Sequence, residues 1–160
     1  MTSRQLLATI ALLAGSTAVA AAQTTATQTV TFQVDAINQI AFSGSPSLVI
    51  NTATAGSAPT AVTAGATWAV TTNQTGSKIT ASLNSAMPAG LTLSANLAAP
   101  AGGTSAGAQN LSNTAVDVVT GITKVAQGSM AVTYSLSATA AAGVVSSTSR
   151  TVTYTITGGT

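Results

Sequence analysis

The chain has 160 residues, of which four are Lys or Arg, two are Asp and none is Glu, His or Cys. This length suits a single domain that buries about two-thirds of its surface without the help of disulfides. The missing side chains exclude the usual nucleophile–base pairs and zinc sites, and the few cations exclude a nucleic-acid-binding face. We therefore expect a non-enzymatic protein with no cofactor and no metal.

The N-terminus predicts a secretory signal peptide over residues 1–22. Arg4 precedes an apolar run from Leu6 to about Val19, and small residues at 18–22 fit an A-x-A cleavage pattern. The run is shorter than the roughly 20 apolar residues of a membrane span, so the mature protein is expected to lack a membrane anchor. Residues 23–160 should then form one secreted domain, at the cell surface or outside the cell.

Period-two alternation begins directly after a short polar tail. Val30, Phe32 and Val34 share one face of the stretch QTVTFQV, with Thr and Gln on the other. Two interpretations stay open: this strand pairs within its own molecule, or it is donated to a neighbouring copy. Further alternation predicts strands at 40–42 and, after the turn SGSPS, at SLVIN (47–51).

The rest of the chain continues as short β-branched runs separated by Gly, Pro and Asn. Strands are predicted at 66–72 and 78–84, joined as a hairpin through NQTGS, and then at 91–97, around Leu111, at 116–122, at 129–138 and at 150–156. The loop 138–149 is predicted to close a second hairpin. No helical stripe is present, so the pattern predicts an antiparallel β-sandwich of eight or nine strands. The predicted core comprises Trp68, Val70, Leu91, Leu93, Val132, Tyr134, Val152, Tyr154 and Ile156.

Three minor chemical options are open to this sequence. A catalytic pair of Asp35 and Asp117 would need folding to bring both into one cleft, and turn caps or solvated carboxylates are the simpler interpretation. A Lys–Asn cross-link from Lys78 or Lys124 beside an aspartate is outweighed by ordinary surface lysines. The sequons at Asn73 and Asn110 are acceptors only in a host that glycosylates them.

The layout resembles secreted prokaryotic β-sandwich subunits: spore-coat-U-like and fimbrial-type domains, and filament subunits of the bundling-pilus and biofilm-matrix kind. The similar stretches are TQTVTFQV after the leader, TWAVTTNQTGSKITASLN in mid-chain and GVVSSTSRTVTYTITGG at the end. The resemblance implies an Ig-like or pilin-like sandwich that polymerises by donor-strand complementation. It also implies that the partners are copies of the same chain or related surface subunits. Fimbrial domains often carry a disulfide, which this chain cannot form.

These observations predict a structural subunit of an extracellular or cell-surface filament, coat or matrix. Val30, Phe32 and Val34 are its candidate donor-strand residues, because an added strand pairs through its backbone and fills pockets with alternate side chains. The alternative is a monomeric secreted module that binds polysaccharide or a surface ligand through loops such as Ala98 to Ala108.

Overall fold

The computed structural model describes residues 23–160, and the predicted signal peptide lies outside the described residues. The chain divides into two units, of which the first ends at Gln33 and the second spans Val34–Thr160. The second unit is an antiparallel β-sandwich, which confirms the predicted fold class. Its elements are β1 (Asn38–Ser43), β2 (Val62–Thr72), β3 (Ser77–Leu83), β4 (Leu91–Leu97), β5 (Thr104–Ser105), β6 (Gln109–Asn110), β7 (Val116–Ile122), β8 (Val125–Ala138), the 3-10 turn η1 (Ala140–Ala142) and β9 (Val152–Thr157).

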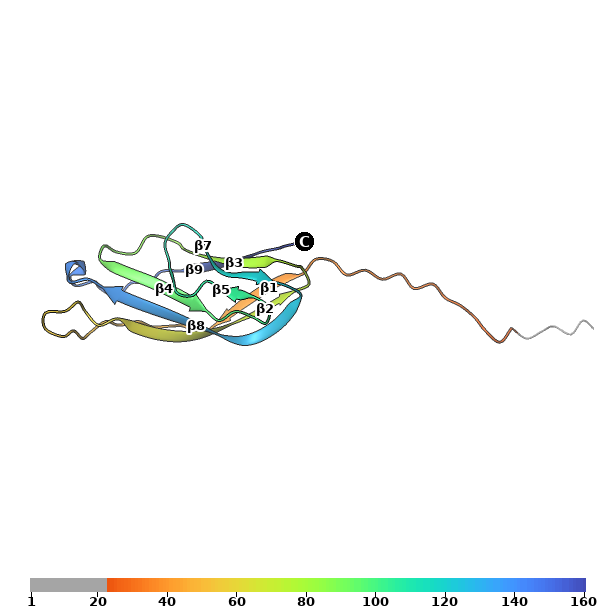
Figure 1. Cartoon of the computed structure of the whole chain (residues 1–160), viewed down its shortest axis with the longest axis horizontal. Coiled ribbons are helices and arrows are strands. Elements are labelled where there is room, and N and C mark those ends of the chain that lie inside the picture. Colours follow the sequence, from red (N-terminus) through yellow and green to blue (C-terminus); the bar gives the residue numbers. More distant parts are fainter. Residues whose placement is uncertain (1–22) are drawn as a thin grey trace, which may run out of the picture. The chain divides into compact units, whose positions relative to one another are not determined.

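Two sheets make up the sandwich, and all their ladders are antiparallel. The first has five strands in the order β1-β2-β8-β4-β6, and the second has four in the order β5-β7-β3-β9 (Figure 1). Apolar and small residues alternate with Thr, Ser and Asn along most strands, so each sheet turns its apolar face inward and its hydroxyl-rich face to water.

The two ends of the sandwich differ. At one, the turn end, Thr72 pairs with Val125 and the chain passes through Asn73–Gly76 into β3. At the other, the loop end, Val62 pairs with Leu136 and long loops connect the strands. The C-terminus lies at the turn end, and the η1 segment lies at the loop end, on the left of Figure 1.

The four-stranded sheet is too short to cover its partner. Strand β2 has 11 residues and β3 has seven, which correspond to lengths of about 36 Å and 23 Å at the usual rise of a strand. Because β3 starts at the turn end, it stops well before the loop end. Along β2 the inward side chains accordingly change from half-buried at Val62 and Ala64 to buried at Trp68 and Val70.

The core lies mainly in the half nearer the turn end. Its largest fully buried side chains include Trp68, Ile79, Leu97 and Ile122. The Trp68 indole N–H donates a hydrogen bond to the carbonyl of Ala98 at 3.1 Å, so its one polar atom is satisfied. Among the residues predicted as core, the structure places five in the buried class (Trp68, Val70, Leu93, Val132, Tyr134) and four in the half-buried class (Leu91, Val152, Tyr154, Ile156).

Both predicted hairpins are wrong. Strands β2 and β3 flank the NQTGS turn but belong to different sheets, and so do β8 and β9 on either side of the loop 139–151. Each connection therefore crosses from one layer of the sandwich to the other. Alternation identifies the face of a strand, but it does not say which strand lies beside it.

The predicted strand boundaries fail where local geometry breaks the period of two. Strand β8 begins at Val125 rather than 129, because a β-bulge between Trp68 and Val70 and a positive φ of 57° at Ser129 shift the alternation. The SLVIN stretch forms no strand, whereas β5 lies in a segment predicted as loop and β6 lies just before Leu111. No strand is assigned within residues 23–37.

We predict that Ile79→Ala lowers the free energy of unfolding by about 2–5 kcal/mol, because the Ile79 side chain is fully buried between the sheets. The single Trp68 provides the fluorescence signal for guanidinium unfolding. The matched control is Lys78→Ala on the same strand, which removes only an exposed ion pair and should change the free energy by less than about 1 kcal/mol. Equal losses for the two variants would contradict this placement of the core.

Candidate functional site

A large groove opens at the loop end, where the four-stranded sheet stops short. Its volume is about 1190 Å³. The floor is the inner face of β4 and β8, and the sides are β1, β9 and the loops around 46–53 and 143–150. Apolar side chains dominate the part that the strands contribute, including Phe42, Leu91, Leu93, Leu136 and Val152. Three of the four predicted core residues that remain half-buried, Leu91, Val152 and Tyr154, line this groove.

An aromatic cluster bridges the two sheets at the groove. The Phe42 ring stacks on the Tyr154 ring with centroids 3.9 Å apart, and on the Trp68 ring at 6.0 Å. The hydroxyls of Tyr134 and Tyr154 lie 2.9 Å apart. Burial, together with the hydrogen bond to Tyr134, raises the pKa of Tyr154 well above its usual value. These contacts join β1, β2 and β8 to β9 in the opposite sheet.

Two edge strands border the groove. Within residues 23–160, β1 pairs only with β2 and β9 pairs only with β3. The inward side chains of β9, at Val152, Tyr154 and Ile156, are half-buried. An exposed edge of this length presents backbone N–H and C=O groups that can pair with another extended chain.

The residues predicted as donor strand lie on an exposed segment. Val30, Phe32 and Val34 are 72%, 89% and 78% exposed. Large apolar side chains in a row of this kind are unusual on a surface exposed to water. The chain has two Phe, two Tyr and one Trp, and every one of these except Phe32 belongs to the aromatic cluster described above.

A set of hydrogen bonds, here called the turn-end clasp, fixes where this segment joins the sandwich. The Asn73 side chain accepts from the Ile37 N–H at 2.8 Å and donates to the Asp35 carbonyl at 2.7 Å. The side-chain amide of Asn38 donates from Nδ2 to Gln74 Oε1 at 2.7 Å. On the same turn, Thr75 and Thr160 exchange backbone hydrogen bonds. The backbone just before β1 and the C-terminus are therefore both held at the turn end.

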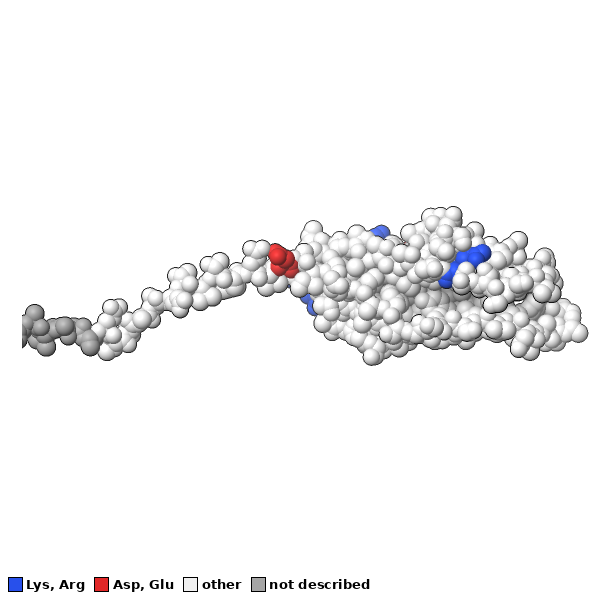
Figure 2. Space-filling model, turned by 180° about the vertical axis from the view of Figure 1, so that it is seen from behind, with Lys and Arg blue, Asp and Glu red and all other residues white. Residues whose placement is uncertain are grey.

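Two of the charged residues form an ion pair on the surface of the sandwich. Lys78 pairs with Asp117 at 3.0 Å, and both side chains are nearly half exposed, so this lysine is a solvated surface residue with an acidic partner. No group of three potential metal ligands occurs within residues 23–160. Figure 2 shows a face that is almost wholly uncharged, with isolated acidic and basic side chains.

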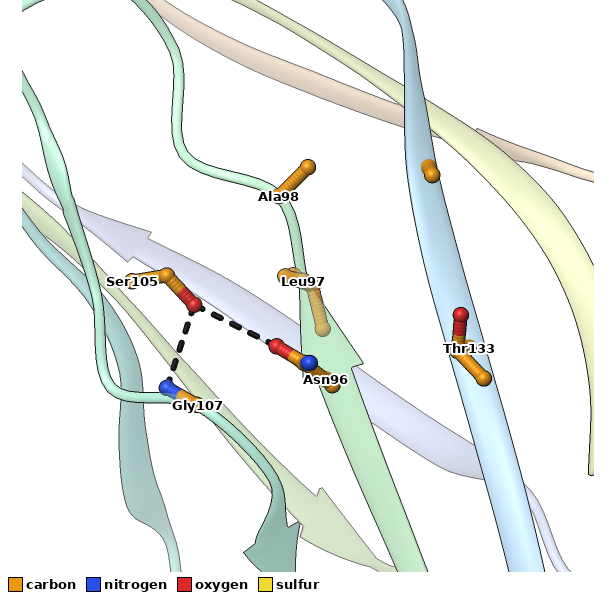
Figure 3. Close-up of a pocket in the computed structure, with 7 residues that line it drawn as sticks. Asn96, Leu97, Ala98, Ser105, Gly107 and Thr133 are labelled. Atoms are coloured by element: carbon orange, nitrogen blue, oxygen red, sulfur yellow. Dashed lines mark hydrogen bonds between the residues drawn. The ribbon is translucent and has the colours of Figure 1, made fainter.

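A second, smaller hollow lies beside the loop 98–108, the loop that the sequence offers as an alternative ligand-binding surface. Its volume is about 400 Å³ (Figure 3). Ser105 Oγ accepts from the Gly107 N–H at 3.1 Å and lies 3.4 Å from Asn96 Oδ1. Apart from Leu97, the other residues that line this hollow have small side chains, and none of the lining residues is aromatic. This hollow lacks the flat rings on which sugars usually stack.

Sequence reasoning identified the exposed apolar segment but not the groove. The groove arises from the unequal lengths of two sheets, which depend on strand pairing. Arg150 also lines it and donates from Nε to the Ala86 carbonyl at 3.0 Å. One sequence signal for this arrangement is the segment 138–149, in which every residue except Val144 and Val145 is small or polar, so that it offers little apolar surface to cover a sheet face.

No helix within residues 23–160 is long and apolar enough to cross a membrane. The absence of membrane association in the mature form stays a prediction.

We predict that the protein loses stability as the pH rises above about 10, the ordinary pKa of tyrosine. The unfolded chain releases the Tyr154 proton there, while the folded protein retains it because its pKa is raised, so the folded state binds more protons. Urea midpoints from about pH 8 to about pH 11 should fall for the native protein and fall less for Tyr154→Phe. An equally steep decline in both proteins would contradict the buried phenol.

Comparison of this chain with protein-family models, with curated proteins and with solved structures finds no match. The basis for a function is therefore the apolar groove, the two free edges beside it and the exposed segment that ends at the turn-end clasp.

Proposed function

We propose that this protein is a non-enzymatic structural subunit of an extracellular or cell-surface filament, coat or matrix, which assembles by β-strand addition. The N-terminal segment of one copy supplies an extended strand, and its apolar side chains become buried in another copy. The protein partners are further copies of the chain, or related subunits with the same open edge.

One observation carries the proposal: the same chain has an exposed row of alternating apolar side chains and an open apolar groove flanked by free strand edges. Val30, Phe32 and Val34 lose contact with water when the strand is added. Their burial favours association by about 1.5–3 kcal/mol for each side chain. The new backbone hydrogen bonds satisfy the edge at the same time.

The composition supports association in place of chemistry. Only 4% of the residues are charged, so copies approach one another with little electrostatic repulsion. The surface residues are mainly Thr, Ser, Ala and Gly, which can pack closely against a second copy. Association costs about 4–15 kcal/mol of translational and rotational freedom. Burial of the three donor side chains offsets about 4.5–9 kcal/mol of this cost, and the new backbone hydrogen bonds add to that gain.

We expect Phe32→Asp to abolish assembly, because it places a carboxylate where an apolar side chain must be buried. The measurement is gel electrophoresis of the mature protein without boiling, where exchanged strands give an SDS-resistant ladder. Electron microscopy of the same sample should show fibres for the native protein and none for the variant.

The matched control is Thr31→Asp, which adds the same charge to the neighbouring side chain on the opposite face of the strand. This variant should assemble, since its carboxylate stays in water. If removal of residues 23–34 leaves the ladder intact, strand donation by this segment is wrong. A stable monomer at high concentration that binds a specific glycan would instead favour the alternative of a secreted binding module.

A further inference from the structure

We propose that the acceptor site is the free edge of β9 together with the loop-end groove of a second copy, and that the donated strand runs antiparallel to β9. This arrangement makes the assembly head to tail. The inference rests on the proposed function and deepens it, since it names the acceptor strand, the direction and the register.

Few edges can accept a strand of useful length. The five-stranded sheet has β1 and β6 as its edge strands, and the four-stranded sheet has β5 and β9. Strands β5 and β6 have two residues each, whereas β1 and β9 have six. Only β1 and β9 can therefore pair along the whole of Val30–Val34, and both border the apolar groove.

The two ends of the molecule set the polarity of the assembly. The donor segment joins its own sandwich at the turn end, where Asn73 holds Ile37 and Asp35. The groove lies at the loop end. A segment that begins at the turn end of one copy and lies in the groove of the next must connect unlike ends. Such a contact is heterologous and continues into an open chain unless the rotation happens to close.

Polarity then determines which edge is used. Residue 34 is the part of the donated strand nearest to its own sandwich, so it lies at the loop end of the acceptor. From its first residue to its last, the donated strand therefore runs from the acceptor's turn end toward the acceptor's loop end. Strand β9 runs in the opposite direction, because it begins at Val152 opposite Leu83 and ends at the turn end with Thr157 opposite Lys78. Strand β1 begins at the turn end, where Asn38 pairs with Thr72, so it runs in the same direction as the donor. The donor is therefore antiparallel to β9 and parallel to β1. Every ladder in the sandwich is antiparallel, the slightly more stable arrangement per residue.

The alternation of the two strands also suggests a register. Donor and acceptor each have apolar side chains at every second residue. In β9 these are the half-buried Val152, Tyr154 and Ile156, of which Val152 and Tyr154 line the groove. The register that matches all of them places Val34 opposite Val152, Phe32 opposite Tyr154 and Val30 opposite Ile156. Phe32 then lies beside the stacked rings of Tyr154 and Phe42, where an aromatic pair adds about 0.5–1.5 kcal/mol beyond its buried area.

Charge agrees with this register at the loop end. Residues 23–34 carry no charge, so none needs to be desolvated in the groove. Asp35 follows them and comes opposite Thr151, next to Arg150, which lines the groove. Because Asp35 alternates with Val34, its carboxylate lies on the outward face, with Thr31, and stays in water when the strand is added.

Cysteine cross-linking tests the strand and the direction together. The chain has no cysteine of its own, so introduced thiols are the only ones present. Thr31 and Thr155 face outward and lie opposite each other in this register. Two single variants, Thr31→Cys and Thr155→Cys, are mixed before assembly and then oxidised, so every disulfide between them joins two molecules. We expect the boiled, non-reduced sample to shift from monomer to the mixed dimer, identified by mass.

The matched control replaces Thr155→Cys with Ala41→Cys, an outward residue on β1. If the SDS-resistant ladder forms but Thr31→Cys cross-links only to Ala41→Cys, strand exchange is correct and the acceptor strand is wrong. If the double variant Thr31→Cys/Thr155→Cys instead forms a disulfide within a monomer, the segment completes its own molecule, and head-to-tail exchange is overturned. Absence of both ladder and cross-link overturns the proposed function as well.

Discussion

The difference in length between the two sheets determines where this molecule is closed and where it is open. Strands β3 and β9 cover the inner face of β2 and β8 from the turn end to about their middle. Within that half the side chains of Trp68, Ile79 and Val132 are excluded from water. Beyond it, Leu91 and Leu136 remain only partly covered. The stable core and the apolar groove are therefore two parts of one continuous layer of apolar side chains.

The turn-end clasp complements the groove. Asn73 is placed by the connection between the sheets, and its side chain fixes the backbone on both sides of Ala36. The buried hydroxyls of Thr72 and Ser77 both donate to Asn38 Oδ1, so they are satisfied by a residue of the same clasp. Polar side chains thus order one end of the sandwich while the other end stays apolar and open. This asymmetry gives the molecule a direction, which a filament subunit needs and a symmetric dimer does not.

Much of the fold could be predicted from the sequence, because a half-buried strand leaves a period of two in its residues. The stretches around Trp68, Ile79, Leu93 and Tyr134 show that period and are strands in the structure. What failed depends on contacts between distant residues. The pairing of β3 with β9 cannot be predicted from the sequence of either strand alone. The β-bulge between Trp68 and Val70, together with the positive φ at Ser129, interrupts the period of two and hides the first part of β8. SLVIN alternates as a strand does, but its residues line the groove without a partner strand.

The candidate site was predictable only in part for the same reason. Val30, Phe32 and Val34 stand out because three large apolar residues alternate with Thr and Gln shortly after the predicted signal peptide. The lining of the groove comes from four strands and three loops, so no single stretch of sequence predicts it. The scarcity of charged side chains is visible in the composition alone. The absence of an enzymatic activity stays a prediction.

The place where β1 enters the sandwich also has a mechanical consequence. The backbone before Asn38 leaves at the turn end, and β1 then runs along β2 through six paired residues. A tension applied to the N-terminal segment along the strand axis would pull β1 lengthwise past β2, so that all the hydrogen bonds of this ladder resist together. Force applied across the strands would instead break them one at a time. The route of the chain therefore suits a subunit that must transmit load along a fibre.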